Sequence, residues 1–195
     1  MYEVFGSVAS RAFRVLWTLE ELGEDYTLTV AKPRDPVITA VYPAGKVPAM
    51  RVGTDILTDS AAIMTFLADK HNALTAPAGT LARAHQDAIM HAILDELDAV
   101  LWTAARHTFV LPEEQRVPAV KPSLMWEFNR NVDRLAKRIT TPFAAGDTFT
   151  IADILLTHCL NWAVGAKFEH ENAQIDEYAN RMRARDAFKR VRALA

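Results

Sequence analysis

Residues 43–63 read PAGKVPAMRVGTDILTDSAAI. A Gly-Thr turn in the middle separates two short runs, 49–52 and 55–57, which we interpret as the strands of a β-hairpin. The small and apolar residues that follow from Ser60 favour a helix that ends near residues 71–72. The stretch therefore predicts a hairpin that leads directly into a helix.

Upstream of the hairpin, residues 2–5 and 26–31 carry the β-branched and aromatic side chains typical of strands. A short helix is expected over 37–41. Between the two strands, apolar residues recur at helical spacing, namely Ala12, Val15, Leu16, Leu19 and Leu22. The expected order is β-α-β-α-β-β-α within residues 1–74, which is an α/β domain.

Ser10 precedes the first predicted helix and is its predicted N-cap. At such a position a hydroxyl group, unpaired backbone N–H groups and the positive end of the helix dipole converge. We therefore expect this turn to hold an anion.

The second half of the chain is expected to be all helical. Residues 73–80 are small, with Pro and Gly, and are predicted to link the first domain to a helical domain over 81–195. A helix that carries Ile89 and Ala104 should pair antiparallel with one that starts near Ser123. A more polar, superficial helix is expected over 173–186.

Thr150 and Asp153 have the spacing of a capping box. Phe149 and Ile154 are placed to form a hydrophobic staple across the same helix start. This doubly fixed start predicts a buried central helix over 150–165.

Composition narrows the classes of function. The 195 residues carry a formal charge of −2 with no Lys/Arg-rich block, so neither nucleic-acid nor membrane binding is indicated. Cys159 is the only cysteine, and no long apolar run is present, so we expect a cytoplasmic protein. His and carboxylate residues lack the spacing of zinc ligands, so no metal is expected.

Two further elements lie beside the predicted strands. The Val47-Pro48 bond directly precedes a strand, and a cis bond there would turn the Val47 backbone towards a peptide-like ligand. The Thr58-Asp59-Ser60 run enters a helix, where the N-terminus and a hydroxyl suit a carboxylate and Asp59 suits an ammonium group.

The motifs PAGKVPA at 43–49, LTDSAAI at 57–63 and FTIAD at 149–153, with the helical second half, resemble the cytosolic glutathione S-transferases of bacterial type. The resemblance covers nearly the whole chain. It implies a thioredoxin-like domain that binds glutathione, a helical domain that binds a hydrophobic electrophile, a homodimer, and a role in detoxification.

The family stabilises the glutathione thiolate with Tyr, Ser or Cys near the end of the first strand. Phe5 occupies the region of the tyrosine in Tyr-type enzymes, and Cys159 lies far along the helical half. The resemblance therefore implies a serine-type site in which Ser10 stabilises the thiolate, with Ser7 as the lesser candidate.

Carried over to this chain, the resemblance places Lys46 at the glycine end of glutathione. Val47, followed by Pro48, should pair with the cysteinyl backbone, and Asp59 and Ser60 should hold the γ-glutamyl group. Many relatives have Asn at the position of Tyr42, which leaves binding intact but reshapes the entrance.

The expected lining of the electrophile pocket comes from the first helix of the second half, with Trp102, Arg106, His107 and Phe109. Trp126, Trp162 and Phe168 are interpreted as core or cleft-wall aromatics. Two alternatives to a transferase stay open. One is a binding or regulatory protein of the same fold, and the other is a glutathione-dependent isomerase, dehalogenase or ether-cleaving enzyme.

Overall fold

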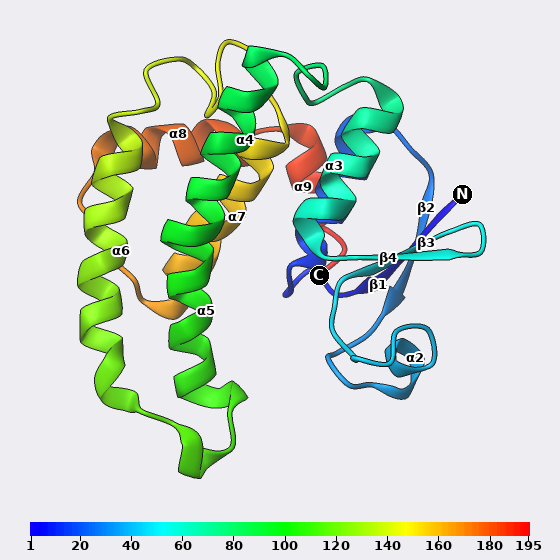
Figure 1. Ribbon diagram of the computed structural model, residues 1–195, viewed down its shortest axis with the longest axis horizontal. Helices are drawn as coiled ribbons and strands as arrows, with labels where there is room; N and C mark the ends of the chain where they lie inside the picture. Colours follow the sequence, from blue (N-terminus) through cyan, green and yellow to red (C-terminus); the bar gives the residue numbers. More distant parts are fainter. The chain divides into compact units, whose positions relative to one another are not determined.

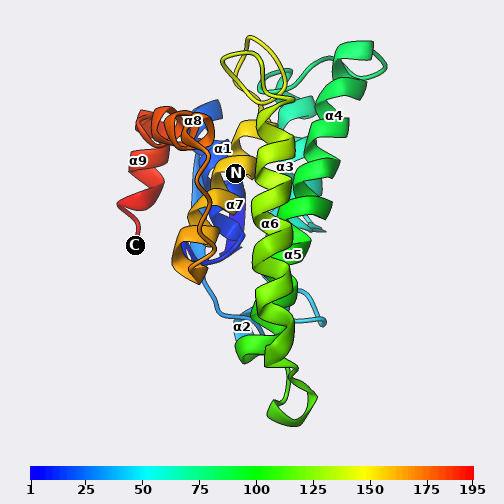
Figure 2. The same ribbon diagram turned by 90° about the vertical axis from the view of Figure 1, so that its left-hand side faces the viewer.

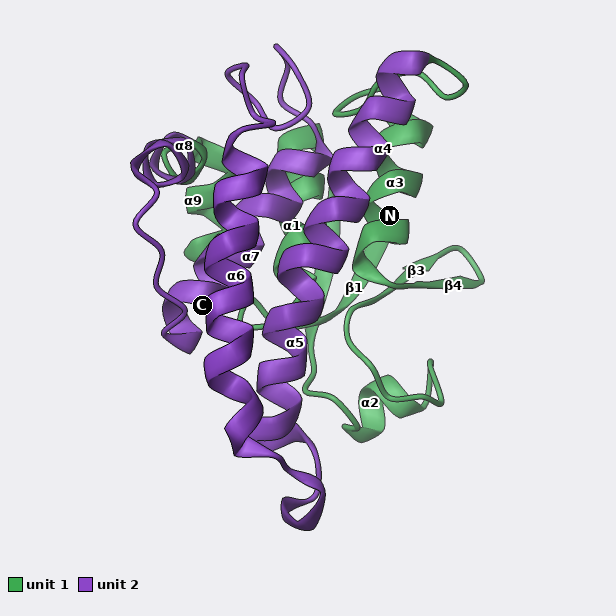
Figure 3. Ribbon diagram, turned by 60° about the vertical axis from the view of Figure 1, so that its left-hand side comes forward, with its two compact units in different colours: residues 1–80, 182–195 green, residues 81–181 purple.

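The computed structural model describes all residues, 1–195, and the chain divides into two compact units (Figure 3). One unit contains residues 1–80 and 182–195, and the other contains residues 81–181. The last helix thus belongs with the α/β unit, whereas the sequence analysis grouped it with the helical domain.

The α/β unit is built on a four-stranded sheet in the order β2-β1-β3-β4. Strand β1 (Tyr2–Gly6) pairs parallel with β2 (Tyr26–Val30) and antiparallel with β3 (Ala49–Val52). Strand β4 (Asp55–Thr58) completes the predicted hairpin with β3. The predicted order of strands and helices is confirmed, as is the thioredoxin-like fold that the family resemblance implies.

Helices cover both faces of this sheet (Figure 1). Helices α1 (Ala12–Leu22) and α3 (Ser60–His71) pack against each other on one face. The short α2 (Pro36–Thr39) lies on the other, where Ile38 joins a small core with Phe5, Ala31 and Ala49. Because successive strand residues point to opposite faces, the sheet is packed on both sides.

The last two helices differ from the prediction of one helix over 173–186. Helix α8 (Ala173–Arg183) ends before α9 (Asp186–Arg192), and the extended backbone of Arg185 separates them. In α9, Phe188 packs its ring 5.3 Å from that of Phe13 and 5.0 Å from that of Trp17, both on α1.

The helical unit begins with one long helical run. Helix α4 (Leu81–Ile93) continues through a π-helical turn (Leu94–Asp98) into α5 (Ala99–Ala105) and a second π-helical turn (Arg106–Val110). Asn131 Nδ2 donates to the Glu96 carbonyl within the first π-turn at 2.9 Å. The wider turn is thus supported by a side chain from the neighbouring helix.

Helix α6 (Lys121–Ala136) lies beside α5, and its start is two residues earlier than predicted (Figure 2). Helix α7 (Ile151–Ala166) confirms the predicted central helix and its capping box. The Asp153 carboxylate accepts the Thr150 amide at 2.8 Å, and Thr150 Oγ1 accepts the Ala152 amide at 3.3 Å. Phe149, the predicted partner of Ile154 in a hydrophobic staple, makes an edge contact with Phe143 at 6.0 Å between ring centroids, and the staple stays a prediction.

Candidate functional site

The register of the sheet brings three loops to the same end. Phe5 pairs with Ala49, and Ala49 pairs with Thr58, so these three residues lie side by side across β1, β3 and β4. The loop after β1 carries Ser7 and Ser10, the loop before β3 carries residues 46–48, and the turn after β4 carries Asp59. All the site residues predicted in the α/β unit therefore follow or precede the strands at one end of the sheet.

Gly6 shows how tightly the first two loops meet. It has a φ of +149°, and a Cβ added there would lie 2.6 Å from Ala12 Cβ. The same point is 3.5 Å from Ser10 Oγ and 3.6 Å from Val47 Cβ. A side chain at residue 6 would therefore fill the space between Ser10 and Val47.

Ser10 organises the turn before α1. Its hydroxyl donates to the Ser7 carbonyl at 2.8 Å and accepts from the amides of Ala12 at 3.1 Å and Ser7 at 3.3 Å. Helix α1 begins at Ala12 with Arg11 at its N-cap position, one residue after the predicted N-cap Ser10, but the Arg11 side chain forms no capping hydrogen bond. Ser10 nevertheless satisfies the first helical amide, which is the work of a capping side chain.

The Val47-Pro48 peptide bond is cis, which is the form considered in the sequence analysis for its effect on the Val47 backbone. Neither the N–H nor the C=O group of Val47 forms a hydrogen bond within the chain. Its side chain packs against the small core that contains Phe5 and Ala49. The Val47 backbone is thus fixed in place and keeps both of its hydrogen-bonding groups for a ligand.

Lys46 is exposed, and no ion pair or hydrogen bond engages its ammonium group. The preceding residue, Gly45, accepts a hydrogen bond from the Arg34 amide at 2.8 Å. Gly45 has a φ of +63°, and a Cβ there would lie 3.1 Å from Arg34 Cα. The loop that carries Lys46 is therefore held against the segment before α2.

Asp59 caps α3. Its Oδ1 accepts the amides of Ala61 at 2.9 Å and Ala62 at 3.1 Å, and its φ of +68° turns the chain sharply from β4 into the helix. The carboxylate is exposed, so its second oxygen remains open to a cation. Ser60, the next residue, has an amide that is not used by this cap.

Ser60 is buried, and its Oγ accepts a hydrogen bond from Arg14 Nη1 at 3.2 Å. Arg14 comes from α1, one helical turn after Ser10, and only 1% of its surface is exposed. Sequence reasoning did not select Arg14. The available signal was a charged residue on the apolar stripe of α1, between Phe13 and Val15.

The candidates in the helical unit lie around the second π-helical turn. Trp102 on α5 is 37% exposed and Phe109 is 66% exposed. Arg106 Nη2 donates to Thr103 Oγ1 at 2.9 Å, and His107 Nδ1 accepts the Val117 amide at 3.1 Å. His107 thus has a structural hydrogen bond, while the two aromatic side chains present apolar surface.

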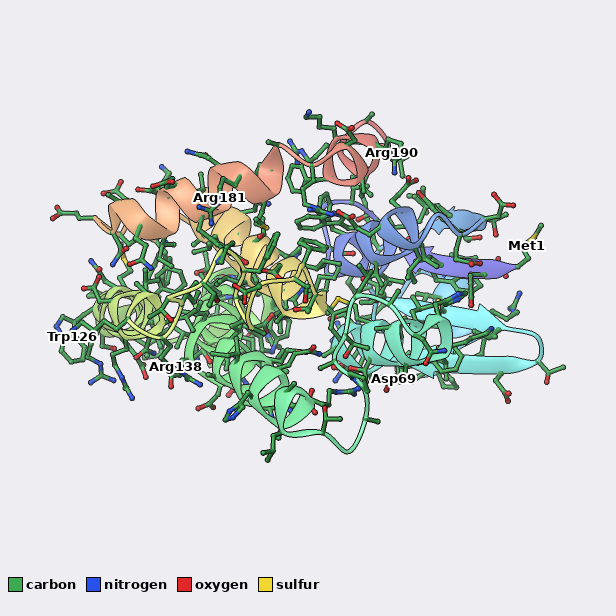
Figure 4. The ribbon with its side chains drawn as sticks, turned by 90° about the horizontal axis from the view of Figure 1, so that it is seen from above. Met1, Asp69, Trp126, Arg138, Arg181 and Arg190 are labelled. Atoms are coloured by element: carbon green, nitrogen blue, oxygen red, sulfur yellow. The ribbon has the colours of Figure 1, made fainter.

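Trp126 is neither a core nor a buried wall residue, because 64% of its surface is exposed. It extends outward from α6 (Figure 4). The guanidinium carbon of Arg130 lies 4.8 Å from the centroid of its ring. Phe168, in contrast, is buried and packs edge-on against Phe128. The α6 stripe through Leu124 and Phe128 explains the error, since Trp126 lies on the opposite side of that helix.

No three His, Cys, Asp or Glu side chains are grouped closely enough to hold a metal ion. No helix combines the length and the apolar character that a membrane crossing requires.

The comparison with known proteins gives a consistent result. The family model described as "Glutathione S-transferase, N-terminal domain" matches residues 10–70, which contain Ser10, the loop before β3 and the start of α3. The chain has the glutathione transferase fold. No protein with curated annotation is similar enough in sequence to count as a relative.

Three solved structures illustrate the likeness in fold. A glutathione transferase homolog from Sulfitobacter with bound glutathione has a TM-score of 0.85 at 20% identity, over 99% of this chain and 97% of that chain. A theta class glutathione S-transferase from Xanthomonas axonopodis pv. citri with glutathione bound has a TM-score of 0.81 at 23% identity, over 97% and 95%. A transferase from Phanerochaete chrysosporium in complex with oxidized glutathione has a TM-score of 0.84 at 20% identity, over 98% and 94%.

Proposed function

We propose that this protein is a glutathione transferase, which binds glutathione as its thiolate and transfers it to a hydrophobic electrophile. The observation that carries the proposal is the convergence of Ser10, the unpaired Val47 backbone and the start of α3 at one end of the sheet. The matched family model and the glutathione-bound structures of the same fold support the choice of glutathione.

Each part of the tripeptide has a chemical partner in this arrangement. The Val47 N–H and C=O offer the paired hydrogen bonds that an extended cysteinyl backbone forms with a strand. Asp59 offers a carboxylate to the γ-glutamyl ammonium, and the Ser60 amide and hydroxyl offer donors to its carboxylate. Lys46 offers a cation to the glycine carboxylate.

Ser10 then lies beside the cysteinyl sulfur and donates its hydrogen to the thiolate. A free thiol has a pKa near ~8.5, so a pKa two units lower requires about 2.7 kcal/mol of preferential stabilisation of the anion. A charge-assisted hydrogen bond together with a helix N-terminus supplies an amount of this size. The thiolate sulfur attacks the electrophile and forms the C–S bond. In a substitution, the electron pair of the broken bond leaves with the departing group. In an addition or a ring opening, that pair moves to the neighbouring atom, which takes up a proton.

The electrophile is proposed to bind to apolar surface from the helical unit, with Trp102 and Phe109 as the exposed aromatic residues and Arg106 and His107 beside them. A homodimer is part of the same proposal, as is a cytoplasmic setting for a chain whose only cysteine, Cys159, is a free thiol.

Calorimetry with glutathione tests binding, and a screen of aryl halides, epoxides and unsaturated carbonyl compounds with product identification tests transfer. We expect binding of glutathione and a thioether product with at least one electrophile class. Absence of glutathione binding at millimolar concentration would refute the proposal.

One observation favours a second candidate, a binding protein of the same fold with little turnover. The Ser10 hydroxyl donates to the Ser7 carbonyl, so its hydrogen must rotate away before it reaches a thiolate. If the turn holds that hydroxyl in place, glutathione binds as the neutral thiol. Absorbance of the bound thiolate at neutral pH separates the two candidates.

A further inference from the structure

Arg14 is a buried cation that the proposed chemistry has not yet used. It lies on α1 with 1% of its surface exposed, among the apolar residues that pack this helix against the sheet and α3. Burial of a guanidinium is costly unless hydrogen bonds compensate for the lost water. An apolar residue at this position would pack without that cost, so the hydrogen bonds of Arg14 need a reason.

One partner of Arg14 is the hydroxyl group of Ser60, at 3.2 Å from Nη1. A guanidinium only donates hydrogen bonds, whereas a serine hydroxyl has one hydrogen to donate and lone pairs to accept. Ser60 Oγ must therefore accept from Arg14, and its own hydrogen is left for a different acceptor. No acceptor for that hydrogen is found within the chain.

Three groups meet where Ser60 begins α3. The Ser60 amide is unpaired, the Ser60 hydroxyl has its hydrogen to give, and the positive end of a twelve-residue helix lies at the same residue. A cation that donates to Oγ also draws electron density from the O–H bond and makes the hydroxyl a stronger donor. This combination suits a carboxylate.

We propose that Arg14 is a positioning residue that orients and polarises the Ser60 hydroxyl, so that the site recognises the α-carboxylate of the γ-glutamyl residue. The inference rests on the proposed binding of glutathione. It adds a residue that never touches the ligand and assigns a function to the only arginine buried in the core of the α/β unit.

The test compares two ligands with four proteins. The ligands are glutathione and γ-aminobutyryl-cysteinylglycine, which lacks only the α-carboxylate of the γ-glutamyl residue. The proteins are the parent chain, Arg14→Met, Ser60→Ala and the double variant. Arg51→Met is the matched control, because Arg51 on β3 is paired with Glu3 on β1 and not with a residue of α3.

We expect Arg14→Met to weaken glutathione binding about tenfold, because the hydrogen bond from the Ser60 hydroxyl to the α-carboxylate becomes weaker. The same substitution should change the affinity for the decarboxylated analogue less than about twofold, and it should add little in the Ser60→Ala background. Arg14→Lys, which keeps one donor and the charge, should recover part of the loss. Arg51→Met should leave both affinities unchanged.

Equal losses for both ligands in Arg14→Met, or full additivity with Ser60→Ala, would show that Arg14 acts only on the packing of α1 and overturn the proposal. If Arg14→Met does not fold, Ser60→Ala alone decides, since equal losses for the two ligands in that variant also overturn it. Failure of the parent chain to bind glutathione would instead refute the proposed function.

Discussion

Replacing Ser10 by alanine removes the one side-chain donor assigned to the thiolate. In the structure its hydroxyl donates to the Ser7 carbonyl, and this neutral hydrogen bond contributes about 1 kcal/mol. A hydrogen bond to a thiolate contributes about 2–3 kcal/mol. The gain on ionisation of the thiol is therefore the difference, about 1–2 kcal/mol, which corresponds to about one pKa unit.

The remaining stabilisation comes from backbone groups at the start of α1, which the substitution retains. We therefore expect Ser10→Ala to raise the pKa of bound glutathione by about one unit and not to return it to that of the free thiol. Thiolate absorbance of the saturated complex, followed against pH, measures the shift.

Ser7→Ala is the matched control, because Ser7 uses its backbone N–H and C=O in the turn and its hydroxyl in no hydrogen bond. It should leave the pKa of the bound thiol unchanged. An unshifted titration in Ser10→Ala, or an equal shift in Ser7→Ala, would refute the assignment of the thiolate donor to Ser10. Loss of the contact to the Ala12 amide should also lower the free energy of unfolding of Ser10→Ala by about 1 kcal/mol.

Three further substitutions test other parts of the account. Asp59→Asn keeps an oxygen for the α3 cap but removes the charge, so calorimetry should show about tenfold weaker glutathione binding. Asp55→Asn, at an exposed position of β4, should leave the affinity for glutathione unchanged. Glu21→Gln disrupts the two hydrogen bonds with Arg185 that hold α9 against α1, so urea titration should show a loss of about 2 kcal/mol, and an unchanged midpoint would contradict this. Burial raises the pKa of Asp153 above its usual 3.8, so the folded chain retains that proton to higher pH and the carboxyl group favours folding less as pH rises. The stability difference between the parent chain and Asp153→Asn should therefore shrink from pH 4 upward, and a difference that does not change with pH would contradict this.

The order of elements in the α/β unit could be predicted because each one carries a local signal. The Gly-Thr turn defines the β3–β4 hairpin, and the Asp-Ser pair at 59–60 marks the start of α3. The capping box at Thr150 is equally local, since both of its hydrogen bonds join residues within one turn. The three loops of the site in the α/β unit were indicated by the same signals, since each adjoins a strand, whereas the roles of their residues came from the family resemblance.

Features that depend on distant partners could not be predicted. Helix α9 packs Phe188 on Phe13 and Trp17. Arg185, just before α9, pairs with Glu21, which is 164 positions away, and Arg190 in α9 pairs with Glu20, which is 170 positions away. The role of Arg14 depends on Ser60 in the same way. A pattern based on a period of 3.6 residues also does not reveal the π-helical turns, because the extra residue shifts the apolar stripe of the helix only after the turn.

The central claim is that this chain binds glutathione and ionises its thiol, and proton release on binding tests it most directly. Calorimetry at pH 7 in buffers of different ionisation enthalpy gives the number of protons released per bound glutathione. A bound thiol with a pKa of about 6.5, against ~8.5 when free, predicts release of about 0.7 proton. Binding without proton release would contradict the claim.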